Sequence, residues 1–87
     1  MTEVDPIWEL VNKFHFASHA ADRDRDRKRA DRLGMASHAI YKIQHSDEPE
    51  SLRALADLRV MVQEPVRADE VIRWLVERGF MEAEVSP

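Results

Sequence analysis

Hydrophobic residues recur every three or four positions through the first half of the chain, which is the spacing of one face of an α-helix. Residues 6–20 carry the first such face, and Asp5 followed by Pro6 is a typical start for it, an N-cap with proline at the first helical position. Residues 24–45 carry the second face. The sequence therefore predicts two amphipathic helices. The apolar positions are Ile7, Leu10, Val11, Phe14, Ala17 and Ala21 in the first, and Leu33, Ala36, Ile40 and Ile43 in the second.

The two apolar faces do not stay in phase with each other. Leu33 follows Ile7 by 26 residues, so on one straight helix at ~100° per residue it would point about 80° away from Ile7. This mismatch predicts a break between the faces. The break could be a turn within residues 22–32, or it could follow a helix that ends with Gly34 as its left-handed terminal residue. We favour the turn, because a helix that begins only after Gly34 would be very short.

Two further helices are predicted over residues 50–63 and 67–78. Asp47 is a candidate N-cap for the first of them. Gly79 fits the left-handed position that commonly ends a helix, and so sets the end of the second. Strict alternation of polar and apolar residues is absent, so the expected fold is all-α, with about four helices in a small antiparallel bundle that carries a charged helical hairpin or a long-helix extension.

Composition agrees with one folded domain. Of the 87 residues, 44% are hydrophobic and 34% are charged, and we expect a single helical domain over residues 1–80 with a flexible tail over residues 81–87. There is no cysteine, which excludes disulfides, thiolate metal sites and cysteine nucleophiles. No apolar run approaches the ~20 residues of a membrane span, and the N-terminal residues lack the pattern of a signal peptide. We therefore expect a cytoplasmic protein without membrane contact.

Residues 22–32, DRDRDRKRADR, are called the charged tract: ten of the eleven are charged. The tract has a net charge of +2, whereas the rest of the chain has −6. A segment with nothing to bury is either solvated or meets a charged partner. Aspartates interrupt the basic residues and would repel a phosphate backbone, so we expect a protein partner and no nucleic acid. The tract residues assigned to partner binding are Arg23, Arg25, Arg27, Lys28 and Arg29.

The helix over residues 67–78 has apolar side chains on more than one face, so its surplus apolar surface is expected to be central or to contact another chain. Ile72, Trp74 and Val76 are the residues assigned to this contact. A chain of this size with unburied apolar residues is expected to form a homodimer.

The histidines are the candidate metal ligands. His15 and His19 are four residues apart and share one helix face. If the turn between the first two helices centres near residue 26, His38 comes level with His15, and the three imidazoles could form a nitrogen site for a transition metal. The sequence contains no Glu-x-x-His pair of the kind that di-iron sites use. We predict no metal and no cofactor, and keep a histidine-lined metal site as an alternative.

Two short resemblances suggest other functions. VIRWLVERGFMEAEV, residues 71–85, is similar to the recognition helix and first wing strand of winged-helix DNA-binding domains, which implies a DNA-binding regulator. Arg32 and His38, in RLGMASH, have a spacing similar to that in HEPN ribonucleases, although Leu33 stands where that family has a polar residue. A hydrolytic site would also need a base, a nucleophile and an orienting group within reach of one another, and the sequence shows no such arrangement. The sequence therefore favours a non-catalytic protein–protein interaction or regulatory module.

Overall fold

A computed structural model describes residues 5–83 and folds them into four α-helices, with no strand among these residues. The helices are α1 (Pro6–Arg23), α2 (Arg27–Gln44), α3 (Pro49–Met61) and α4 (Ala68–Glu77). The predicted all-α fold is thereby confirmed. Across residues 5–83 no helix combines the length and the apolar character needed to cross a membrane.

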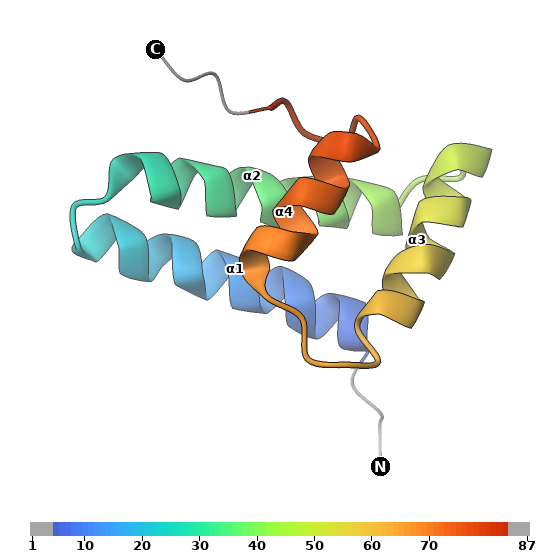
Figure 1. Cartoon of the computed structure of the whole chain (residues 1–87), viewed down its shortest axis with the longest axis horizontal. Helices are drawn as coiled ribbons and strands as arrows, with labels where there is room; N and C mark the ends of the chain where they lie inside the picture. The colour runs from blue at the N-terminus through green and yellow to red at the C-terminus, as the bar shows by residue number, and fades with distance from the viewer. Residues whose placement is uncertain (1–4, 84–87) are drawn as a thin grey trace.

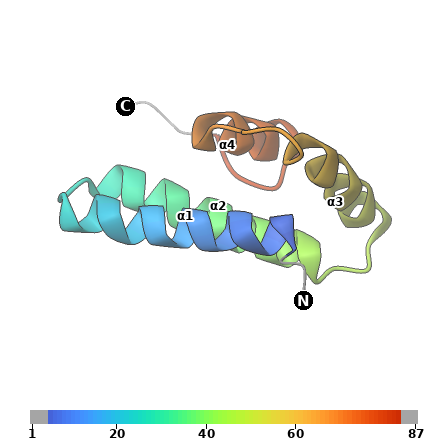
Figure 2. The ribbon, with the colours of Figure 1, turned by 90° about the horizontal axis from the view of Figure 1, so that it is seen from below.

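The four helices form two layers (Figure 1 and Figure 2). Helices α1 and α2 lie antiparallel and pack tightly as a hairpin, and α3 and α4 lie across one face of it. Helices α3 and α4 contain 13 and 10 residues and are shorter than the hairpin helices, which contain 18 each. They cross the hairpin and leave its tip uncovered (Figure 1). Within residues 5–83, no helix covers the opposite face of the hairpin (Figure 2).

The hairpin turn lies inside the charged tract, as predicted. The N–H of Asp26 donates to the carbonyl of Ala21 at 2.9 Å, and the N–H of Arg25 donates to that of Asp22 at 3.0 Å. This pair of bonds is a Schellman motif, which needs a left-handed residue, and Arg25 occupies that position with φ +62°. The Asp26 carboxylate then accepts from the N–H of Arg29 at 3.2 Å and caps α2.

Small residues let α1 and α2 approach closely. Gly34 lies within α2, so the alternative break at this residue is wrong. A Cβ at Gly34 would lie 3.4 Å from Oγ of Ser18. The Ser18 hydroxyl donates to the carbonyl of Ala30 at 2.8 Å, and the buried Ser37 hydroxyl donates to the carbonyl of Val11 at 3.1 Å. These two hydrogen bonds join the helices along the hairpin.

The hydrophobic core lies between the two layers and draws on every helix. Each large aliphatic side chain removed from water stabilises the fold by roughly 1.5–3 kcal/mol. Met81 also belongs to this core, with 8% of its surface exposed, so the predicted tail does not begin at residue 81. Residues 84–87 lie outside the described part of the chain. The largest fully buried side chains are Ile7, Ile40, Ile43, Leu58, Val71 and Leu75.

Local sequence predicted the end of α4 correctly but not the start of α3. Helix α3 begins after Glu48 without a side-chain cap, so the predicted cap at Asp47 is wrong. Gly79 ends α4 as predicted: its φ is +81°, and the N–H of Phe80 donates to the carbonyl of Leu75 at 2.9 Å.

Candidate functional site

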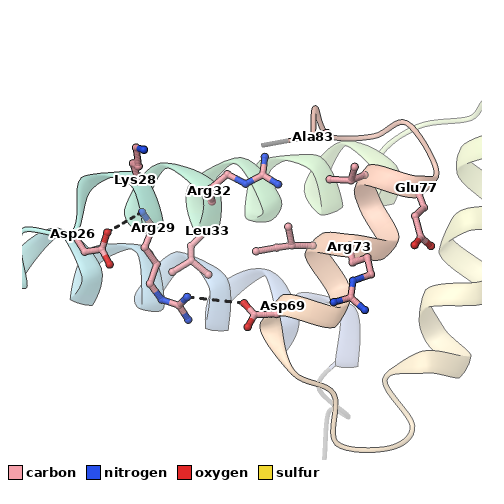
Figure 3. Close-up of a pocket in the computed structure, with 11 residues that line it drawn as sticks. Asp26, Lys28, Arg29, Arg32, Leu33, Asp69, Arg73, Glu77 and Ala83 are labelled. Atoms are coloured by element: carbon pink, nitrogen blue, oxygen red, sulfur yellow. Dashed lines mark hydrogen bonds and ion pairs between the residues drawn. The ribbon is translucent and has the colours of Figure 1, made fainter. Parts of the chain in front are cut away.

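A groove with a volume of about 650 Å³ lies between the tip half of α2 and α4 (Figure 3). Its size is within the usual range for ligand sites in proteins. Every side chain that lines it is either charged or aliphatic. The lining residues are Asp26, Lys28, Arg29, Arg32 and Leu33 from α2 and its cap, Asp69, Ile72, Arg73, Val76 and Glu77 from α4, and Ala83.

Helical spacing explains the arrangement of the α4 side of the groove. Asp69, Arg73 and Glu77 follow one another at intervals of four residues and form one row of charges. Ile72 and Val76, also four residues apart, form a neighbouring apolar row on the same side of the helix. The α4 side therefore offers an apolar strip bordered by charges of both signs.

The α2 side of the groove is basic, and one of its arginines reaches across to α4. Arg29 Nη1 lies 3.9 Å from Asp69 Oδ1, and the dashed line in Figure 3 marks this ion pair. The two side chains are 54% and 74% exposed, so the pair contributes little to stability and can open without much loss of free energy.

Arg32 connects α2 to the segment that follows α4. Its Nη1 atom donates to the backbone carbonyl of Glu82 at 2.7 Å. This bond holds the segment beside the groove, where Ala83 forms part of the lining (Figure 3). The guanidinium group of Arg32 therefore has a structural partner within the described chain.

The structure brings together four of the eight residues that the sequence assigned to partner binding. Lys28 and Arg29 of the charged tract line the groove, and so do Ile72 and Val76 of α4. The remaining tract residues are exposed at the hairpin tip and do not line the groove: Arg23, Arg25 and Arg27.

Trp74, the eighth assigned residue, has a different environment. It is half-buried, and its ring stacks on that of Phe80 with 6.5 Å between centroids. The guanidinium carbon of Arg78 lies 5.1 Å from the Trp74 ring centroid, and Arg78 also pairs with Asp57 of α3. These contacts connect α4 to α3, so Trp74 lies outside the groove.

Sequence reasoning missed the charged row of α4. Asp69, Arg73 and Glu77 were not assigned to the site, although their spacing of four residues is visible in the sequence. Leu33 was assigned only to the core of the hairpin, whereas it also lines the groove.

The predicted convergence of three histidines does not form. Nε2 of His15 lies 3.2 Å from Nε2 of His19, and the two rings are 4.6 Å apart. His38 is exposed and does not join them, since residues 5–83 contain no group of three or more potential metal ligands. His45 instead lies against Tyr41, with 4.3 Å between ring centroids.

The two resemblances do not continue into the structure. The segment after α4 forms a turn and no strand over the described residues 80–83, so the first wing strand that the winged-helix pattern implies is not formed there. Arg32 lines the groove and binds the carbonyl of Glu82, whereas His38 is exposed and is not part of the groove lining. The Arg–His pair therefore does not converge on one site.

Comparison with known protein families, curated proteins and solved structures finds no match to this chain.

Proposed function

We propose that this protein is a non-catalytic interaction module whose α2–α4 groove binds an acidic amphipathic segment of another protein. One observation carries the proposal. Lys28 and Arg29 lie in the charged tract and Ile72 and Val76 lie in the last helix, yet all four line one groove. An apolar centre bordered by charges is the usual anatomy of a protein–protein contact.

The charges of the groove favour acidic side chains in the bound segment. Three of its four cationic side chains come from α2 and lie together on one side. Among the described residues, Lys28 and Arg73 form no ion pair, so both can pair with an incoming carboxylate. Charges of this kind raise the association rate and select the partner, while the apolar strip supplies most of the contact free energy.

Synthetic peptides can test this preference directly. We would prepare three helical peptides that share one row of leucines and differ only in the flanking residues, which are Glu, Lys or Gln. Fluorescence anisotropy against the full chain should give the tightest binding for the Glu peptide and the weakest for the Lys peptide. The difference should shrink as salt is added, because the contacts are exposed to solvent.

A pair of matched variants separates the groove from the charged tract as a whole. Lys28→Glu with Arg29→Glu reverses two charges in the groove, and Arg25→Glu with Arg27→Glu reverses two charges at the tip. Only the first variant should lose the preference for the Glu peptide. Equal binding of the Glu and Lys peptides, or equal loss in both variants, would overturn the proposal.

A further inference from the structure

The face of the hairpin that points away from α3 and α4 gathers uncharged, largely aromatic side chains. Helical periodicity places eight residues on this surface, which we call the open face. Within residues 5–83, no helix covers it (Figure 2). Phe16 and Met35 lie at its edges. The open face consists of Trp8, Asn12, His15, Phe16 and His19 on α1, and Met35, His38 and Tyr41 on α2.

All the exposed large hydrophobic residues of the hairpin lie on the open face. Phe16 is 68% exposed, and Trp8, Tyr41 and Met35 are 45–46% exposed. Aromatic rings also contact one another on this face: the ring of His15 packs edge-on against that of Phe16, with 6.0 Å between the ring centroids. Tryptophan and tyrosine are enriched where proteins contact one another.

The middle of the open face carries no carboxylate, ammonium or guanidinium group, although 34% of the chain is charged. The same helical periodicity places Asp31 and Lys42 beside these residues on α2, with Asp31 toward the hairpin tip and Lys42 toward the opposite end. An uncharged centre with a charged rim distinguishes a contact surface from an ordinary solvated helix face.

We infer that the open face binds a second copy of this chain, so that two hairpins stack into a four-helix bundle. The positions of Asp31 and Lys42 indicate that the partner is a second copy of the chain. Asp31 and Lys42 are separated by about three helical turns and project from nearly the same side of α2, one on each side of its middle. A two-fold axis that lies in the interface and crosses the helices brings Asp31 of one copy to Lys42 of the other, and forms this ion pair twice.

The hairpin is large enough for a dimer contact. An 18-residue helix is about 27 Å long at ~1.5 Å per residue, and two adjacent helices are ~20 Å wide. A contact over the full length of the hairpin would cover roughly 540 Å² on each copy, about 1,100 Å² in total, which is close to the ~1,000 Å² expected of a specific interface. The sequence predicted a homodimer and gave the last helix as one possible contact surface, whereas this geometry assigns the contact to α1 and α2 and leaves the groove free.

Sedimentation equilibrium of the full chain at neutral pH and low ionic strength tests the inference. The wild type should have twice the 10.1 kDa mass of one chain. Trp8→Asp should shift the protein toward monomer. Leu52→Asp is the matched control, because Leu52 is 54% exposed near the start of α3 and outside the open face. A monomeric wild type at the highest attainable concentration, or equal effects of the two variants, would overturn the inference.

A charge exchange identifies the partner as a second copy. Asp31→Lys or Lys42→Asp alone should weaken the dimer by roughly ten-fold, since each replaces two attractive pairs with two repulsive ones. The double variant should regain the wild-type dissociation constant, and an equimolar mixture of the two single variants should form the heterodimer preferentially. If the double variant is as weak as the single ones, the two-fold arrangement is wrong.

The dimer contact and peptide binding in the groove can be tested independently of each other. Lys28→Glu with Arg29→Glu should leave the dimer mass unchanged, and Trp8→Asp should leave Glu-peptide binding unchanged. A loss of both properties in either variant, with the helical circular dichroism spectrum intact, would contradict the assignment of two separate surfaces.

Discussion

Arg29 of α2 and Asp69 of α4 form an ion pair across the groove, with 3.9 Å between Nη1 and Oδ1. The pair partly neutralises the basic side of the groove in the absence of a partner. An acidic segment that enters the groove must therefore compete with Asp69 for Arg29, and this competition leads to the first prediction.

Asp69→Asn should strengthen binding of the Glu peptide. Arg29 would be free for the peptide, and an exposed ion pair contributes ~0.2–1 kcal/mol, so the affinity should rise by up to about five-fold. Glu70→Gln is the control, because Glu70 also lies in the first turn of α4 but does not line the groove. Both variants should lower the melting temperature through the helix dipole, and Asp69→Asn slightly more because it also removes the ion pair. Tighter binding in both would contradict a specific role for Asp69.

Arg25→Gly should stabilise the protein. Arg25 has φ +62° at the left-handed position of the hairpin turn, where a side chain costs about 1–2 kcal/mol and glycine does not. The greater freedom of glycine in the unfolded chain offsets part of this gain, so we expect an increase of ~0.5–1 kcal/mol in the free energy of unfolding. Urea denaturation measures it. Arg23→Gly, within α1, should lower the same quantity by up to about 1 kcal/mol.

Asp26→Ala should destabilise the hairpin. Its carboxylate accepts the hydrogen bond from the N–H of Arg29 that caps α2, and loss of such a cap costs about 0.5–2 kcal/mol. Asp24→Ala provides the comparison within the same turn, because no hydrogen bond involves the Asp24 side chain among the described residues. Equal losses of unfolding free energy in the two variants would show that the cap does not stabilise α2.

Met81→Ala should destabilise the fold by about 2 kcal/mol or more, because it removes a buried side chain from the core. Glu82→Ala should have little effect, since the side chain is exposed and Arg32 binds the backbone carbonyl that the variant retains. Thermal and urea unfolding of the two variants measure the difference. A harmless Met81→Ala substitution would place the end of the core before residue 81.

The start of α1, the end of α4 and the hairpin turn were predictable because their signals are local. Asp5 and Pro6 set the beginning of α1 through one cap and one fixed backbone angle, and Gly79 ends α4 because it adopts a left-handed conformation without strain. The mismatch between the two apolar faces predicted a break, and the shortness of a helix that would begin after Gly34 favoured the charged tract as its place. The start of α3 was predicted incorrectly because Glu48 begins it without a side-chain cap.

The sequence by itself determined the four helices, the charged turn between the first two and most of the buried faces, since each depends on residues a few positions apart. Only the tertiary structure decided which charges and apolar residues share the groove, how Trp74 packs and that His38 stays apart from His15 and His19. The separation of the histidines depends on how α1 packs against α2, whereas the groove and the packing of Trp74 depend on where α4 crosses the hairpin. Simultaneous packing of side chains from all four helices sets that position, and no single segment of the sequence encodes it.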